Sequence, residues 1–131
     1  MNKILSLSIL ILLFLVGCNA AINMNGKVAG MSSGRFIYQD GDLSSNYQAD
    51  IDSVWAACEK TLTGLKATNI QKERKIASGT IQAVIQDEKV TIKVEYLERD
   101  LTSVSVFVGV VGNNIASRLI HEKIIGNLAR H

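Results

Sequence analysis

Apolar and polar side chains alternate through three consecutive segments, 80–86, 90–96 and 102–110, and no other feature constrains the fold as strongly. A period of two indicates β-strands that bury one face. The residues expected on the buried face are Ile81, Ala83, Ile85, Val90, Ile92, Val94, Tyr96, Val104, Val106, Val108 and Val110. A sheet with one apolar face and one mostly polar face is typical of antiparallel strands covered on a single side.

The lengths of the two turns predict the register of these strands. A two-residue turn at residues 87–88 sets Ile85 opposite Val90 and Ala83 opposite Ile92. A three-residue turn at Glu98, Arg99 and Asp100 then sets Val90 opposite Val108 and Ile92 opposite Val106. Because a slip of one residue would move a whole apolar set to the other face, only turns of this parity keep the apolar side chains together.

On the polar face the same register places two apolar side chains in one row. Val84 is predicted opposite Thr91, and Thr91 opposite Phe107. A lone exposed phenylalanine is ordinary, so the simpler interpretation is that Phe107 packs on Val84 and Val111. The functional alternative is a small docking surface made of Phe107, Val84 and Lys93, with an aromatic anchor and a polar rim.

Two helices are predicted to cover the apolar face. The first has apolar residues at helical spacing, namely Ile51, Val54, Trp55, Cys58 and Leu62. Asp50 is placed as its amino-terminal cap and Gly64 is placed to stop it. Cys58 lies mid-stripe, so we interpret it as a core thiol and not as a nucleophile, because burial raises a thiol's pKa.

The last helix is predicted to start after Gly112, with Asn113 or Asn114 as cap. Its expected apolar stripe is Ile115, Ala116, Leu119, Ile120, Ile124 and Leu128. His121 is expected at the rim. The segment Gly109–Gly112 before the helix could form an anion-binding nest, but a bulge and a turn are the simpler interpretation.

Two segments are open to more than one interpretation. Arg35–Tyr47 is either one edge strand bent at a bulge or a hairpin turning on Asp40 and Gly41, and we favour the bent strand. A weak strand is expected near residues 67–72, followed by a basic cluster at residues 72–75. This cluster could meet lipid headgroups, although a solvated loop is the simpler interpretation.

The predicted fold is a two-layer α+β sandwich, with four to five antiparallel strands and two helices on one face, forming a single domain over residues 35–131.

An apolar run over residues 4–16 precedes this domain and ends in a short motif. The motif, which is Leu15, Val16, Gly17 and Cys18, resembles the lipobox of bacterial lipoprotein precursors. The run has 13 residues, whereas a membrane span needs about 20, so residues 1–17 are predicted to be a signal peptide. Cys18 would carry the lipid as a thioether, and residues 18–34 would form a lipidated flexible tether. An ordinary secretory signal with an incidental cysteine is the alternative.

Charge and residue inventory exclude several functions. The chain has 14 Lys and Arg against 12 Asp and Glu, and loss of Lys3 with the signal peptide leaves a net charge of +1. A net charge this close to zero does not indicate a protein that binds nucleic acid. With Cys18 lipidated, Cys58 has no partner for a disulfide within the chain. His121 and His131 are the only histidines, so we expect no metal site, no cofactor and no catalytic residues.

The chain also resembles a family of small bacterial lipoproteins of unknown function. The likeness rests on the lipobox, on residues 38–43 with Gly41, on residues 62–65 and above all on residues 102–112 leading into the last helix. Members of that family often have an acidic pair after the second glycine, where this chain has Asn113 and Asn114. The resemblance implies a lipoprotein and brings no activity with it.

Together these features predict a membrane-anchored envelope lipoprotein that is not an enzyme. The expected role is that of an interaction or structural module with an envelope protein as partner, and the alternative is a small amphiphile or lipid carrier that binds between helices and sheet. In a bacterium with two membranes the expected location is the inner leaflet of the outer membrane, facing the periplasm, because Asn19 is not the Asp that often follows the cysteine of inner-membrane lipoproteins. In a cell with one membrane the anchor would hold the domain outside it.

Overall fold

A computed structural model describes residues 36–129. The predicted signal peptide, the lipobox with Cys18 and the whole predicted tether lie outside the described residues. The elements in chain order are β1 (Ile37–Gln39), β2 (Asp42–Tyr47), α2 (Ile51–Gly64), β3 (Thr68–Arg74), β4 (Ser78–Ile85), β5 (Glu88–Glu98), β6 (Leu101–Val108) and α3 (Asn114–Ala129).

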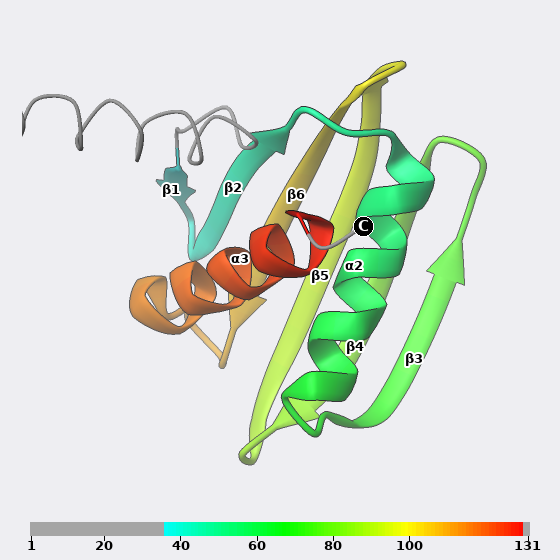
Figure 1. Cartoon of the computed structure of the whole chain (residues 1–131). Helices are drawn as coiled ribbons and strands as arrows, with labels where there is room; N and C mark the ends of the chain where they lie inside the picture. Colours follow the sequence, from blue (N-terminus) through cyan, green and yellow to red (C-terminus); the bar gives the residue numbers. More distant parts are fainter. Residues whose placement is uncertain (1–35, 130–131) are drawn as a thin grey trace, which may run out of the picture. The chain divides into compact units, whose positions relative to one another are not determined.

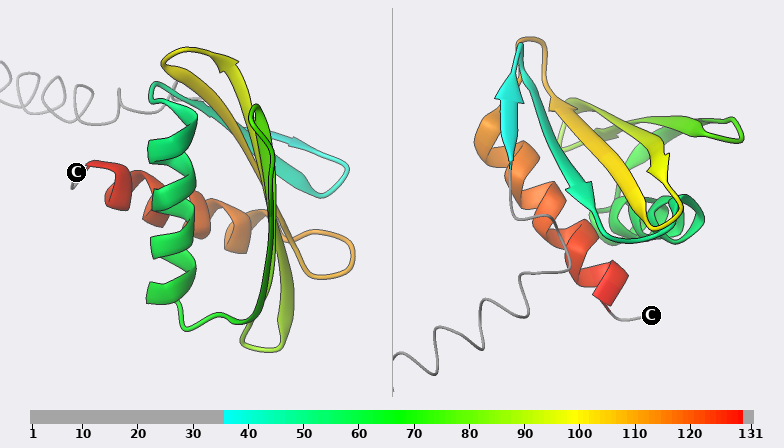
Figure 2. Two further views of the ribbon diagram at one scale, coloured as in Figure 1. Left: turned by 90° about the vertical axis from the view of Figure 1, so that its right-hand side faces the viewer. Right: turned by 90° about the horizontal axis from the view of Figure 1, so that it is seen from above.

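The six strands form one antiparallel sheet in the order β1-β2-β6-β5-β4-β3. Both helices cover the same face of this sheet and leave the other face open (Figure 1; Figure 2, left). The predicted α+β fold with two helices on one face is confirmed. The expected four to five strands were too few, because residues 37–47 form two strands instead of one.

The hairpin of β1 and β2 replaces the single bent strand that we favoured. Tyr38 pairs with Leu43 and Gln39 with Asp42, so the chain reverses direction at the two residues between them. Those residues, Asp40 and Gly41, have φ angles of +53° and +86°. Positive φ at both positions is the turn geometry for which Asp-Gly is preferred, and it matches the twist of the strands that it joins.

The register between β5 and β6 is as predicted. Val90 pairs with Val108 and Ile92 with Val106, and the register shifts by one residue between Tyr96 and Glu98. This irregularity shortens the predicted three-residue turn to the two residues between Glu98 and its partner Leu101. The alternating aliphatic side chains of both strands therefore share the face that the helices cover, namely Val90, Ile92, Val94, Val104, Val106 and Val108.

The register between β4 and β5 differs from the prediction by two residues. Ala83 pairs with Val90 instead of Ile92, because the turn is made by Gln86 and Asp87 and not by residues 87–88. Gln86 and Asp87 have φ angles of +48° and +65°. A shift of two residues leaves every side chain on its predicted face, which is why the alternating pattern could not detect it.

Helix α2 begins as predicted, with Asp50 accepting a hydrogen bond of 3.0 Å from the backbone N–H of Ser53. Gly64 is its last residue, but the left-handed residue that ends the helix is Lys66, at φ +58°. The N–H of Ala67 then donates to the carbonyl of Leu62 at 3.0 Å, which closes the last turn.

Helix α3 is rotated relative to its predicted stripe. Asn113 is the cap, since its Oδ1 accepts from the N–H of Ala116. The buried residues are Ser117, Ile120, His121, Ile124 and Leu128. Ile115 and Leu119, which we expected in the core, are exposed, so two polar residues take the place of two aliphatic ones at the sheet.

Candidate functional site

A buried polar cluster lies between β2 and α3, centred on His121. The hydroxyl of Tyr47 lies 2.6 Å from Nδ1 of His121, and Nε2 of the same ring lies 2.7 Å from the carbonyl oxygen of Leu43. A carbonyl can only accept, so Nε2 carries the proton, and Nδ1 accepts from the Tyr47 hydroxyl. Desolvation lowers the pKa of His121, and the bond to Leu43 opposes this in part. The imidazole is therefore held neutral, and the predicted rim position of His121 is wrong.

Two serine hydroxyls belong to the same layer. Ser45 on β2 and Ser117 on α3 are buried, and neither hydroxyl has a hydrogen-bond partner within residues 36–129. Sequence reasoning missed this cluster, although alternation along Leu43, Ser45 and Tyr47 places all three on one face of β2. Hydropathy gave no signal for it, because the partners of His121 lie more than 70 residues away in the chain.

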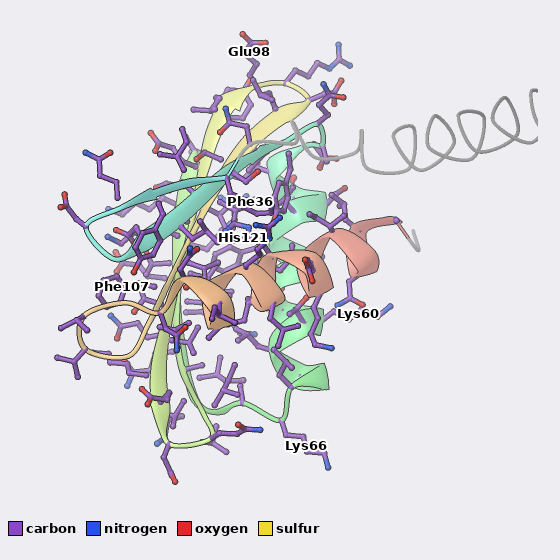
Figure 3. All side chains as sticks on the ribbon, turned by 90° about the vertical axis from the view of Figure 1, so that its left-hand side faces the viewer. Phe36, Lys60, Lys66, Glu98, Phe107 and His121 are labelled. Carbon is purple, nitrogen blue, oxygen red and sulfur yellow. The ribbon has the colours of Figure 1, made fainter. Side chains whose placement is uncertain are left out.

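The first described residue packs onto this cluster from the side. The ring of Phe36 meets His121 edge to face, with centroids 5.1 Å apart (Figure 3). The guanidinium of Arg118 lies over the Phe36 ring, 5.1 Å from its centroid. The chain therefore enters the described domain against the middle of α3, held by an aromatic contact and a cation–π contact.

The turn between β1 and β2 touches the loop between β6 and α3 through glycines. Gly112 has φ +96°, and a Cβ on it would lie 2.4 Å from Cα of Gly41. A Cβ on Gly41 would lie 2.5 Å from Cε2 of Phe107 and 2.6 Å from the carbonyl oxygen of Val111. Backbone therefore packs on backbone at this point, which only glycine permits.

The predicted row of Val84, Thr91 and Phe107 does not form. Thr91 does pair with Phe107, but Val84 pairs with Lys89, so Gln82 occupies its predicted place beside Thr91. Phe107 lies on the side of the sheet away from the helices, where its ring is half-buried against the Gly41 turn (Figure 3). Lys93, two residues after Thr91 on β5, is exposed and pairs with Ser105. The suggested docking function of this face stays a prediction.

Cys58 is buried on α2 at the centre of the core. Desolvation raises the pKa of its thiol to about 12, with a smaller contribution from Glu59. A thiol of this kind is protonated at neutral pH and is a poor nucleophile.

The basic cluster at residues 72–75 is not the loop that we expected, because Lys72 and Arg74 lie on strand β3. Lys72 Nζ is 2.6 Å from Glu59 Oε2, and Arg74 Nη2 is 2.8 Å from Asp52 Oδ1. Both bases thus pair with acids on α2.

A shallow hollow of about 360 Å³ lies between the ends of α2 and α3. It is lined by Thr61, Gly64, Leu65, Glu122, Lys123, Gly126 and Asn127.

Inside the part of the chain that the structure describes, no group of three or more His, Cys, Asp or Glu could hold a metal ion. Over those same residues, no helix is long and apolar enough to cross a membrane.

A family model described as a protein of unknown function, DUF3568, matches residues 2–127, which is nearly the whole chain. A comparison with curated proteins found no match. The predicted resemblance is confirmed in its coarser part, a family of unknown function, and the lipoprotein part of it stays a prediction.

Proposed function

The chain belongs to the DUF3568 family, whose function is unknown, and from that premise we propose that it is a lipid-anchored protein of the bacterial envelope whose domain acts as a non-enzymatic interaction module. The observation that carries the proposal is the apolar run of residues 4–16 followed by Leu15, Val16, Gly17 and Cys18. A run of that length suits a signal peptide better than a membrane span. A cysteine immediately after it suits thioether attachment of diacylglycerol.

The chemistry of the domain supports a binding role over catalysis. Both ring nitrogens of His121 are engaged inside the core, and the thiol of Cys58 is buried and protonated. The acids Glu59 and Asp52 are paired with bases of β3. These groups, which in other proteins serve as bases or nucleophiles, are here either buried in the core or paired with a neighbouring base.

The alternative of an amphiphile carrier needs a cleft between helices and sheet. In this protein that space is occupied by side chains such as Val54, Ile92, Val106 and Ile124, all of which are buried. The hollow between α2 and α3 has Glu122, Lys123 and Asn127 in its lining, which does not suit an acyl chain. The interaction module is therefore the function we propose.

The anchor is tested by replacing Cys18. In cells fed a palmitate analogue, the wild-type protein should take up label, whereas Cys18→Ala should take up none and should migrate as the longer precursor. Cys58→Ala, which removes the other cysteine, serves as the matched control and should be labelled like the wild type. Label retained by Cys18→Ala would contradict the proposal. Separation of the two membranes by density should then place the labelled protein in the outer membrane.

A further inference from the structure

We propose that the domain rests on the lipid bilayer through an apolar lip made of Val110, Val111, Ile115 and Leu119. This inference rests on the lipid anchor proposed above. It adds that one particular corner of the domain faces the membrane, and it names lipid acyl chains and not a protein as the partner of that corner.

The lip consists of aliphatic side chains that the fold leaves in solvent. Val110 is 95% exposed, Val111 83%, Ile115 84% and Leu119 52%. They fall within ten consecutive residues, across the loop that joins β6 to α3 and along the first turns of that helix. Single exposed apolar residues are ordinary, but four in one short stretch of a small domain mark a contact surface.

The loop that carries Val110 and Val111 is held in place by the turn between β1 and β2. Gly112 lies against Gly41, and the carbonyl oxygen of Val111 faces the same turn. Asn113 then caps α3, which fixes the start of the helix that carries Ile115. In both views of Figure 2 the loop projects beyond the sheet beside the β1–β2 turn, so Val110 and Val111 lie on a braced projection.

The helical part of the lip lies beside the first described residue, Phe36. Phe36 contacts Arg118, which lies on α3 between Ile115 and Leu119 in sequence. Seventeen residues separate Cys18 from Phe36, and a chain of that length spans at most about 60 Å. A lipid on Cys18 therefore keeps the whole domain near the bilayer at a high effective concentration, and the exposed apolar side chains of the lip decide which side of it makes contact.

Composition and size favour a bilayer over a protein partner. The lip contains only branched aliphatic side chains, whereas protein interfaces are enriched in Tyr, Trp, Phe, Met and Arg. A stable protein interface also takes roughly 20 to 30 residues from each side, far more than this lip provides. A tethered domain needs only a few apolar side chains at the headgroup boundary, because the anchor already supplies the attachment.

The test uses the full-length mature protein, reconstituted in phosphatidylcholine vesicles. Val111→Cys and Ile115→Cys, made separately, are labelled with an environment-sensitive maleimide dye. The buried Cys58 and a lipidated Cys18 should not react. Ile76→Cys is the matched control, since Ile76 is aliphatic, 97% exposed and located at the β3–β4 turn, at another corner of the domain (Figure 1). In the lip, the dye should shift to the blue and be quenched by a nitroxide on the lipid acyl chains, while the Ile76→Cys dye should do neither.

The dye experiment has outcomes that would overturn the membrane contact of the lip and outcomes that would support it. Dyes at Val111→Cys and Ile115→Cys that behave like the dye at Ile76→Cys would overturn the proposal. A blue shift without nitroxide quenching would also overturn it and would point to a second copy or another protein on the lip. Dye uptake by wild-type protein would show a free Cys18, and the anchor and this inference would fall together. Equal quenching with and without phosphatidylglycerol in the vesicles would support an apolar contact.

Discussion

His121 carries a hydrogen bond on each ring nitrogen and lies fully inside the protein, where desolvation favours the neutral imidazole. Protonation would place a charge in the core and turn Nδ1 into a second donor, so the Tyr47 hydroxyl, whose own pKa burial raises, would have to accept from it instead of donating. The packing of α3 against β2 therefore favours the neutral form of His121.

From this follows a pH dependence of stability. Desolvation lowers the pKa of His121 in the folded chain, while an unfolded histidine titrates near 6.5. As the pH falls below about 6.5, the unfolded chain binds a proton here that the folded chain does not, so the free energy of unfolding should fall, by up to about 1.4 kcal/mol per pH unit. Urea unfolding at about pH 7.5 and pH 5.5 measures this loss.

His121→Gln is the control for that measurement. It should be less stable than the wild type at the higher pH, because the buried hydrogen bonds change, but it should lose less between the two pH values. Asp50 does not interfere, since its hydrogen bonds to Ser53 lower its pKa and confine its effect to more acidic solution. An equal loss in both proteins would show that His121 is not the titrating group.

Cys58 is expected to behave as a core residue. In the native protein its thiol should resist a maleimide reagent, and it should react once denaturant exposes it, because the group is buried and its pKa is raised to about 12. Cys58→Ser should lower the free energy of unfolding by about 1 to 3 kcal/mol, since it buries a hydroxyl in an apolar setting. Rapid labelling of the native thiol would be incompatible with its place in α2.

At the scale of elements, the contact between the β1–β2 turn and the β6–α3 loop depends on Gly112. Gly112→Ala places a methyl group 2.4 Å from Cα of Gly41 at a φ of +96°, so it should lower the free energy of unfolding by about 1 to 3 kcal/mol. Gly126→Ala is the matched control, because Gly126 is helical and its Cβ would point into open space. That change should raise stability by about 0.5 to 1 kcal/mol.

Thermal or urea unfolding of the two glycine variants measures both effects. Similar stabilities for Gly112→Ala and Gly126→Ala would mean that the loop moves away from Gly41 at little cost. The lip would then not be braced in the way that the backbone contact implies.

The alternating pattern predicted the sheet well because it depends on one quantity, the face on which each side chain lies. Every apolar residue of β4 fell on its predicted face even though the register with β5 was wrong by two residues. Register depends on which residues form the turn, and Gln86 and Asp87 carry no strong signal for positive φ. Asp40 and Gly41 do carry that signal, and the hairpin there was the alternative that we ranked second.

The residues that α3 buries could not be predicted from its own sequence. Ile115 and Leu119 have the spacing of core residues, yet the fold buries Ser117 and His121 in their place. His121 can be buried because Tyr47 and the carbonyl of Leu43 satisfy it, and both are distant in sequence. Hydropathy along one helix cannot detect a partner on another element, so the polar cluster and the lip were both missed.

At the scale of the whole domain, the sheet is open and has two edges, β1 and β3. β1 has only three residues, which leaves little backbone for another strand to join. β3 has seven exposed residues and a register irregularity between Thr68 and Gln71. Irregularity and charge are two ways in which proteins prevent an edge strand from pairing with another molecule.

If the charges of β3 protect the edge, removing them should cause self-association. In Lys72→Gln/Glu73→Gln the net charge is unchanged. The two ion pairs that are lost, Lys72 with Glu59 and Glu73 with Lys75, are exposed, and each should cost only about 0 to 1 kcal/mol of stability. The variant should nevertheless form dimers or larger species with rising concentration, detected by sedimentation, because Arg74 is then the only charged side chain left on β3. Glu122→Gln/Lys123→Gln makes the same chemical change on the exposed face of α3 and should stay at the wild-type size. If both variants remain unchanged, Lys72 and Glu73 are not needed to protect the edge.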